Sequence, residues 1–277
     1  MTSPARHLPI LDVRHVKKTY VSRARTVEAI GDLDFTVNDG EFVCIVGPSG
    51  AGKTTLLRCI AGLLDRTSGD VVFEGSTVSA PPKDMAVVFQ EYGRSVFPWL
   101  TVRGNIELPL KERRMPTAVL REKVDNALSA VGLAEAGDAY PWQLSGGMQQ
   151  RAAIARAIAY EPKLLIMDEP FAAVDAQTRA DLEDLVRDLW KRLKVTVLFV
   201  THDIDEAVYL GERVLVLSSS PTIVLEEVQV DLPFDRDQLT TRMLPRFATL
   251  RAHVYERIQE AKRGSRTMTP TTVERTA

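Results

Sequence analysis

The segment GPSGAGKT, from Gly47 to Thr54, restricts the fold of this 277-residue chain more than any other feature. It follows a short apolar run, Phe42 to Val46, that is typical of a buried strand, and a run with helical periodicity begins at Lys53. The segment matches the P-loop pattern G-x-x-x-x-G-K-[ST], in which a glycine-rich loop joins a strand to a helix. The pattern therefore predicts an α/β fold with a phosphate-binding loop at the end of one strand.

Each part of this loop has an expected role toward a nucleotide. The glycines expose backbone N–H groups to the β- and γ-phosphates, Lys53 neutralises the phosphate charge, and the Thr54 hydroxyl ligates Mg²⁺. We expect ATP to contact the whole loop: Gly47, Pro48, Ser49, Gly50, Ala51, Gly52, Lys53, Thr54 and Thr55. A P-loop alone does not distinguish a transporter ATPase from a kinase, a GTPase or a helicase.

A second motif, LLIMDEP from Leu164 to Pro170, is an apolar strand followed by two carboxylates. Adjacent residues at a strand end point in different directions, so the two carboxylates can have different roles. We expect Asp168 to hold Mg²⁺ and Glu169 to face the γ-phosphate, where it orients or deprotonates the attacking water. In a chain without a P-loop, the same residues would indicate only an acidic surface turn.

Three single residues complete the predicted site. Gln90 follows the strand-like run Ala86 to Phe89, where its amide can reach Mg²⁺ or water, and His202 follows another such run, where its imidazole can bind the γ-phosphate. Tyr20 precedes the P-loop by about one hairpin, so its ring can stack on adenine. A lone Gln, His or Tyr is more often structural, but the position of Gln90 and His202 after strands of a P-loop protein favours the functional interpretation.

The segment LSGGMQQR, from Leu144 to Arg151, predicts a second phosphate site that has no lysine. Ser145 offers a hydroxyl, and Gly146 and Gly147 allow the main chain to approach a ligand closely. The apolar periodicity that follows indicates a helix, so the glycines lie at its N-terminus, where free N–H groups favour phosphate.

The pattern along the chain divides it into parts. Strands and helices alternate up to residue 225, and a mostly helical stretch from about residue 91 to 160 interrupts them. This predicts a mostly parallel sheet with an N-terminal antiparallel section and an inserted helical subdomain. Residues 226–263 form a helical appendage, with Gln238 to Lys262 as its amphipathic helix. The polar, threonine-rich residues 264–277 are typical of a disordered tail.

The composition of the chain limits where in the cell it is expected and which kinds of partner it is expected to bind. The formal net charge of −2 gives no reason to expect nucleic acid as a partner. The two cysteines, Cys44 and Cys59, lie in apolar patterns that indicate core residues of a reduced, cytosolic protein. The sequence contains no signal-peptide pattern and no apolar run long enough to span a bilayer. We therefore expect a soluble chain that acts on a membrane only through a partner.

Together, these motifs resemble the nucleotide-binding subunit of an ATP-binding cassette (ABC) transporter over about Leu11 to Leu225. The resemblance includes Asp175, in the loop AAVDAQ. It implies that two cassettes face head to tail, so that Ser145, Gly146 and Gly147 of one subunit cap the γ-phosphate on the P-loop of the other, with Asp175 at the interface. Glu169, His202 and Lys53 would be catalytic, and Thr54, Gln90 and Asp168 would hold Mg²⁺.

Two longer segments, FPWLTVRGNI and THDIDEAVYLGERVLVLSSSP, are similar to sequences of the importer branch for nitrate, aliphatic sulfonates and taurine. This implies a homodimer on the cytoplasmic face of the membrane, with permease subunits and a periplasmic or lipid-anchored substrate-binding protein. An exporter subunit is the nearer alternative, and a soluble ABC ATPase is the more distant one. The segment Tyr92 to Thr101, with Phe97, Trp99 and Leu100, is predicted either to couple the cassette to the permease or simply to pack the helical subdomain.

Overall fold

The computed structural model describes residues 9–22, 25–90 and 96–266. In this part of the chain the larger sheet has the order β10 (Val224–Gln229), β9 (Arg213–Leu217), β3 (Phe42–Val46), β8 (Thr196–Val200), β7 (Leu164–Asp168) and β6 (Met85–Val88). Neighbouring strands are parallel except β10 and β9. Every residue of the four inner strands is buried, as expected for parallel strands that are covered on both faces.

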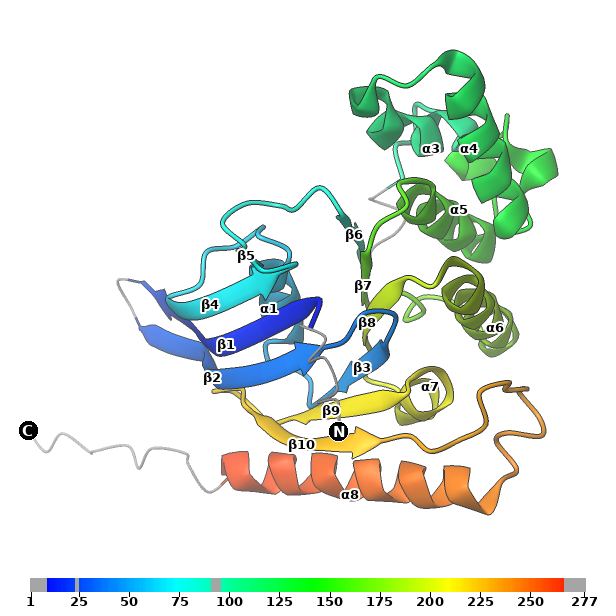
Figure 1. Cartoon of the computed structure of the whole chain (residues 1–277). Helices are drawn as coiled ribbons and strands as arrows, with labels where there is room; N and C mark the ends of the chain where they lie inside the picture. The colour runs from blue at the N-terminus through cyan, green and yellow to red at the C-terminus, as the bar shows by residue number, and fades with distance from the viewer. Residues whose placement is uncertain (1–8, 23–24, 91–95, 267–277) are drawn as a thin grey trace, which may run out of the picture.

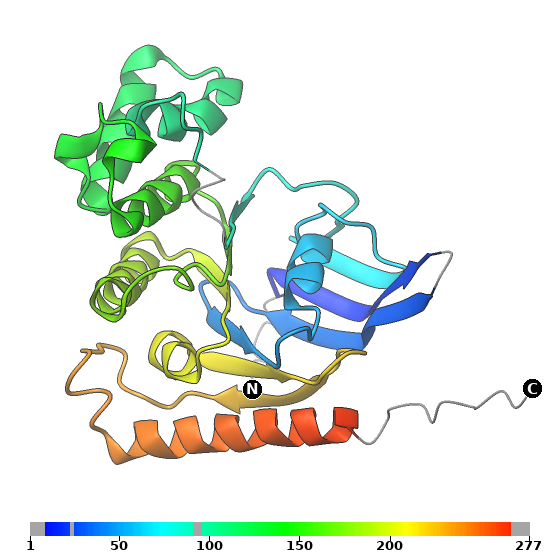
Figure 2. The ribbon, with the colours of Figure 1, turned by 180° about the vertical axis from the view of Figure 1, so that it is seen from behind.

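The smaller sheet is antiparallel and belongs to the N-terminal part of the chain. Its order is β2 (Thr26–Val37), β1 (Leu11–Val21), β4 (Ser68–Phe73) and β5 (Ser76–Thr77). Helix α1 (Lys53–Ile60) lies between the two sheets (Figures 1 and 2), and its apolar residues share one buried cluster with both. The predicted α/β fold, with a mostly parallel core and an N-terminal antiparallel section, is confirmed.

Helices cover the other face of the larger sheet. They are α5 (Gly146–Ala159), α6 (Ala176–Leu193) and α7 (Ile204–Leu210) (Figure 1). Helices α3 (Val102–Leu110) and α4 (Thr117–Ala130) pack on α5 beyond the β6 edge, with the short 3₁₀ helices η1 (Lys111–Arg113), η2 (Ala134–Ala136) and η3 (Pro141–Gln143) around them. These helices come from the segment assigned above to the inserted subdomain.

Helix α8 (Pro245–Arg266) lies along β9 and β10 (Figures 1 and 2). The apolar stripe of this amphipathic helix consists of residues at helical spacing, and all of them are buried in the main core: Phe247, Leu250, Val254 and Ile258. The helix begins later than the pattern predicts and ends inside the range predicted as a tail; residues 267–277 of that range lie outside the described residues. Among the described residues, no helix combines the length and apolar character needed to cross a membrane.

Sequence reasoning missed helix α7, strand β10 and the two-residue strand β5. Helix α7 is too short for helical periodicity to stand out, and its start depends on Asp203, whose side chain accepts hydrogen bonds from the N–H groups of Asp205 and Glu206. Strand β10 is an edge strand that is mostly not buried, so it lacks a strong apolar signal.

Candidate functional site

The polar residues of the candidate site come from strands that end at one edge of the larger sheet. Gly47 follows β3, Gln90 follows β6, Asp168 ends β7, and His202 follows β8. The carboxyl ends of parallel strands meet at the same edge, which is where α/β proteins bind ligands. Residues from four separate parts of the sequence are thereby brought together.

Glu169 is at the centre of this group. Its Oε2 atom accepts a hydrogen bond from the Gln90 amide at 3.2 Å and lies 3.0 Å from Nδ1 of His202. Its Oε1 atom lies 3.7 Å from the ammonium of Lys53. The backbone of Glu169 is left-handed, with φ of 44°, which directs the side chain away from the strand line toward the P-loop. The carboxylate is thus held by groups that can all contact a phosphate or its attacking water.

Lys53 is folded back into the P-loop. Its ammonium donates hydrogen bonds to the carbonyl oxygens of Gly47 at 3.0 Å and Pro48 at 3.2 Å. Burial lowers the pKa of Lys53, and the negative charges of Glu169 and Asp168 oppose that effect. A phosphate in the loop would provide the buried ammonium with a stronger acceptor than the two carbonyls.

The P-loop backbone has the conformation of an anion cradle. Gly50 and Gly52 are left-handed, with φ of 77° and 78°, a conformation that residues with a Cβ rarely adopt. Gly52 is also the N-cap of α1, so no side chain satisfies the first N–H groups of this helix. Free N–H groups at a helix N-terminus favour phosphate, both through hydrogen bonds and through the helix dipole.

Asp168, Thr54 and Gln90 fit the expected Mg²⁺ site. Asp168 is 4% exposed, and its Oδ1 atom is a buried oxygen without a hydrogen-bond partner in the described structure. Burial raises the pKa of Asp168, while a hydrogen bond with Thr54 opposes that rise. Thr54, Gln90 and Asp168 line one cleft, and all three offer the oxygen ligands that Mg²⁺ prefers.

Tyr20 lies beside the P-loop helix, as expected for an aromatic residue that stacks on a base. Its hydroxyl is 3.4 Å from the hydroxyl of Thr55, and the residue is 42% exposed. The ammonium of Lys18 lies 5.2 Å from the ring centroid. One ring face is therefore already near a cation, and the exposed part of the ring is available to a planar ligand.

The predicted second phosphate site lies on the other side of the larger sheet from α1 (Figure 1). Ser145 is the N-cap of α5 and accepts a hydrogen bond from the N–H of Met148, and Gly146 and Gly147 form the first turn. Asp175 caps α6 through the N–H and hydroxyl of Thr178. No hydrogen bond within the described residues joins Ser145, Gly146, Gly147 or Asp175 to the P-loop. One chain therefore places the second set of residues close together at the starts of α5 and α6, but no hydrogen bond of the described structure connects that set to the P-loop of the same chain.

A family model described as ABC transporter matches residues 30–172. The chain belongs to the ABC transporter family. It is 45% identical to the nitrate import ATP-binding protein of Synechocystis sp., covering 83% of this chain and 85% of that one. It is 41% identical to the aliphatic sulfonates import ATP-binding protein of Bacillus licheniformis, covering 90% and 94%.

Solved structures support the same assignment to the ABC ATPases. An ATP-binding cassette solved as a dimer in a post-hydrolysis state, with ADP and Pi, is 33% identical with a TM-score of 0.71, covering 79% of this chain and 98% of that one. A Clostridium perfringens component of an ABC transporter complex is 28% identical with a TM-score of 0.72, covering 80% and 89%. This ABC transporter chain is therefore an ATP-binding ATPase.

The sequence patterns did not identify the residues that stabilise the backbone of the P-loop and of the turn that carries His202. Thr222 is fully buried and donates a hydrogen bond to the carbonyl of Ala51 in the P-loop. Arg179 and Glu206 contact the turn that carries His202. In the sequence, Thr222, Arg179 and Glu206 appear only as a hydroxyl or a charge near a motif. Their partners are distant in sequence and come close only when the chain folds.

Proposed function

We propose that this chain is the ATP-hydrolysing subunit of an importer for a small anion of the nitrate, aliphatic sulfonate or taurine class. The names of relatives at 41–45% identity over most of the chain support import of nitrate or aliphatic sulfonates, and taurine is included on the sequence resemblance alone. The convergence of Gln90, His202 and Lys53 on Glu169 is the observation that carries the catalytic part of the proposal.

In the proposed reaction, Glu169 accepts a proton from a water molecule that attacks the γ-phosphorus, and the bond between that phosphorus and ADP breaks. Lys53 and the P-loop N–H groups bind the phosphates, and His202 contacts the γ-phosphate. Thr54, Gln90 and Asp168 would hold Mg²⁺, which neutralises charge on the β- and γ-phosphates when it is bound.

The proposal requires a homodimer. Ser145, Gly146 and Gly147 are at the start of α5, where a helix N-terminus favours phosphate, and among the described residues no hydrogen bond joins them to the P-loop of the same chain. They would cap the γ-phosphate on the partner's P-loop, with Asp175 at the interface. ATP would then join the two subunits, and loss of the γ-phosphate would release them.

Glu169→Gln tests the catalytic assignment. The amide preserves size but cannot accept the proton, so we expect ATP binding to persist, turnover to be abolished and an ATP-bound dimer to accumulate. Turnover near the unmodified rate would overturn the assignment. Ser145→Arg tests the shared site: we expect reduced turnover with unchanged ATP binding to the monomer, and unchanged turnover would exclude the head-to-tail arrangement.

The outer part of the cleft that Thr54, Gln90 and Asp168 also line is the proposed contact with the permease. Phe97, Leu108 and Tyr160 contribute to its lining, and the whole cleft has a volume of about 1360 Å³. The neighbouring Trp99 is 69% exposed, and its ring centroid is 5.2 Å from that of Phe97. This exposure favours coupling over packing; residues 92–95 of the predicted segment lie outside the described residues. We expect Trp99→Ala to retain basal ATPase activity and lose transport; general destabilisation would instead support packing.

The proposed partners are integral-membrane permease subunits and, through them, a periplasmic or lipid-anchored substrate-binding protein. The chain would lie peripherally on the cytoplasmic face of the membrane. Co-purification with a permease and a binding protein, followed by thermal-shift measurements of that binding protein with nitrate, sulfonates and taurine, tests direction and substrate. A permease complex that accumulates substrate inside inverted vesicles would favour the exporter alternative.

A further inference from the structure

The turn that carries His202 is fixed by hydrogen bonds from both of its neighbours. The hydroxyl of Thr201 accepts a hydrogen bond from the N–H of Asp203 at 2.9 Å. Asp203 in turn caps α7 by accepting hydrogen bonds from the N–H groups of Asp205 and Glu206 at 2.8 and 3.2 Å. The imidazole of His202 therefore projects toward Glu169 from a turn whose backbone is already constrained.

Glu206 stabilises this turn by accepting a hydrogen bond from Thr201. Its side chain is 4% exposed, and its Oε2 atom accepts a hydrogen bond from the hydroxyl of Thr201 at 2.6 Å. Burial raises the pKa of Glu206 to about 7, and the hydrogen bond from Thr201 opposes that rise. Burying a charged carboxylate costs free energy unless the group is paired and hydrogen-bonded. The burial of Glu206 therefore indicates a specific partner.

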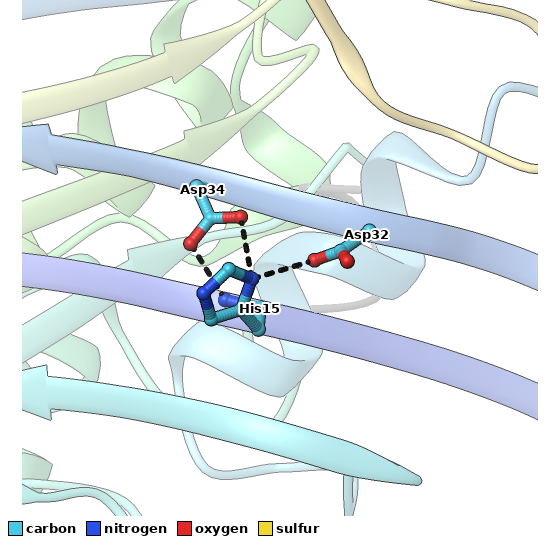
Figure 3. A group of neighbouring side chains, drawn as sticks. All are labelled: His15, Asp32 and Asp34. Atoms are coloured by element: carbon cyan, nitrogen blue, oxygen red, sulfur yellow. Dashed lines mark hydrogen bonds and ion pairs between the residues drawn. The ribbon is translucent and has the colours of Figure 1, made fainter.

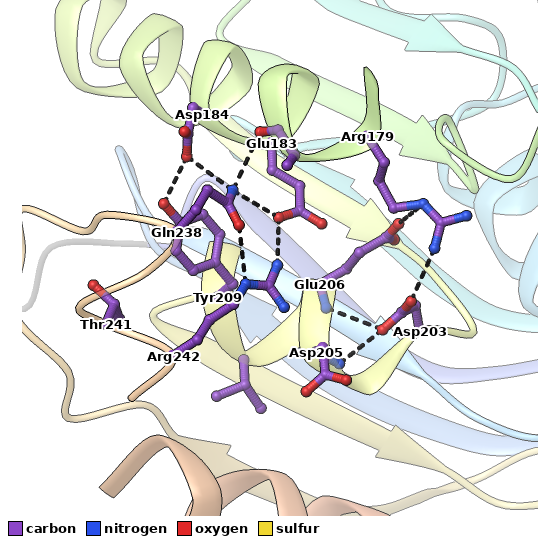
Figure 4. Close-up of polar contacts among 12 residues, drawn as sticks. Arg179, Glu183, Asp184, Asp203, Asp205, Glu206, Tyr209, Gln238, Thr241 and Arg242 are labelled. Carbon is purple, nitrogen blue, oxygen red and sulfur yellow. Dashed lines mark hydrogen bonds and ion pairs between the residues drawn. The ribbon is translucent and has the colours of Figure 1, made fainter. Parts of the chain in front are cut away.

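Arg179, in the first turns of α6, is that partner (Figure 4). Its guanidinium lies 3.4 Å from Oε1 of Glu206 and donates a hydrogen bond to Oδ2 of Asp203 at 3.2 Å. One cation thus contacts both acidic residues that fix the His202 turn. The backbone N–H of Arg179 donates to the carbonyl of Asp175 at 2.9 Å, so the same residue is also one helical turn from the predicted interface loop.

We propose that Arg179 and Glu206 are positioning residues that hold His202 against Glu169. Among the described residues, no hydrogen bond or ion pair joins either residue to Glu169 or to the P-loop; both act through the Thr201–Asp203 turn. Because the catalytic effect of a group depends steeply on its placement, loosening the turn should slow hydrolysis more than it weakens ATP binding. The inference rests on the proposed roles of Glu169 and His202 in hydrolysis.

Two variants separate charge from hydrogen bonding. Glu206→Gln can still accept the hydrogen bond from Thr201 but loses its charge toward Arg179, and Arg179→Gln loses the charge toward both acids. We expect kcat to fall about 10-fold to 100-fold in Arg179→Gln and less in Glu206→Gln, with the ATP dissociation constant unchanged in both. Arg179→Lys, which can pair with one acid at a time, should lie between Arg179→Gln and the unmodified chain.

A matched control is available in another ion pair that involves α7. Arg251 pairs with Asp205 of α7 at 2.7 Å, and neither residue contacts Thr201 or Arg179 through a bond that the described structure contains. Arg251→Gln removes an ion pair to α7 without loosening the turn, so its kcat should match that of the unmodified chain. A kcat loss as large as that of Arg179→Gln would indicate a general effect on α7 and overturn the proposal.

The ring signals of His202 provide a direct readout by NMR. The chain has four histidines, so the His202 signals can be assigned by their loss in His202→Ala. We expect Arg179→Gln to shift or broaden these signals and Arg251→Gln to leave them unchanged. Unchanged signals and unchanged kcat in Arg179→Gln would overturn the positioning role. If Glu169→Gln and His202→Ala also retained turnover, the proposed catalytic roles themselves would be wrong.

Discussion

The hydroxyl of Thr222 donates a hydrogen bond to the backbone carbonyl of Ala51, inside the P-loop. Thr222 is fully buried; its N–H donates to the carbonyl of Ala29 at 3.2 Å, and its carbonyl accepts from the N–H of Gly31 at 2.9 Å. The residue therefore connects β2 to the peptide that precedes Gly52. It thereby holds the backbone of the P-loop in place next to β2.

Thr222→Val keeps the side-chain shape and removes the donor. The Ala51 carbonyl would then be buried without this partner, at a cost of about 1–3 kcal/mol. We expect a lower free energy of unfolding and about tenfold weaker ATP binding by calorimetry, because the loop is less well preorganised. Thr222→Ser retains the hydroxyl and should bind ATP like the unmodified chain. Equal ATP affinity for Thr222→Val would exclude a role in holding the loop.

Gly147 leaves no room for a side chain at the start of α5. A Cβ at this position would lie 2.4 Å from Cγ2 of Thr178, in the first turn of α6. We expect Gly147→Ala to lower the free energy of unfolding by about 1–3 kcal/mol, as overpacking does, and to reduce ATP turnover because α5 must shift. Thr178→Ser removes the methyl group and keeps the hydroxyl that bonds to Asp175. The double variant should therefore recover stability, and no recovery would place the strain elsewhere.

The central part of the site could be predicted from sequence because each residue follows a strand. Gln90, Glu169 and His202 all stand just after apolar runs, and parallel strands bring their carboxyl ends to one edge whatever the details of packing. The buried stripe of α8 was predictable for a similar reason, because periodicity of 3.6 residues identifies the face that packs.

The supporting residues could not be predicted because their roles depend on partners far away in sequence. Arg179 meets Glu206 only after α6 and α7 have packed on the same face of the sheet, and Thr222 reaches Ala51 only after β9 and β10 have formed. Neither arrangement leaves a periodic or spaced pattern in the chain. The late start of α8 has a similar cause, since Gln238 bonds to Glu183 and Asp184 of α6 instead of joining the helix (Figure 4).

Gln150 is a buried polar residue whose removal should stabilise the chain. It is fully buried on α5, and neither its Nε2 nor its Oε1 has a hydrogen-bond partner in the described structure. Gln150→Met has a similar shape and no amide to desolvate, so we expect the free energy of unfolding to rise by about 1 kcal/mol and Tm to rise by about 2–4 °C.

The neighbouring Gln149 provides a matched control for this substitution. Its amide donates to the carbonyl oxygens of Pro141 at 2.9 Å and Leu144 at 3.3 Å. Gln149→Met removes these bonds and should lower Tm in the same thermal-unfolding experiment. A lower Tm for Gln150→Met as well would mean that the Gln150 amide is hydrogen-bonded in solution.

His15 forms an exposed charged cluster with two acids of β2 (Figure 3). Its Nδ1 atom lies 3.0 Å from Oδ1 of Asp32 and 3.2 Å from Oδ2 of Asp34. The hydrogen bond with Asp32 is the main cause that raises the pKa of His15, followed by the charge of Asp34. The same hydrogen bond lowers the pKa of Asp32.

These shifts predict a pH window for stability. A raised histidine pKa adds stability that is complete below the unfolded pKa of about 6.5 and is lost as pH rises through the folded value. The lowered Asp32 pKa adds stability above an unfolded pKa of about 4 that is lost as pH falls through its folded value. His15→Asn tolerates the positive φ of 48° without a charge. Its Tm deficit should therefore be larger at about pH 5.5 than at about pH 9 and should shrink in about 1 M salt; equal deficits would contradict the charged cluster.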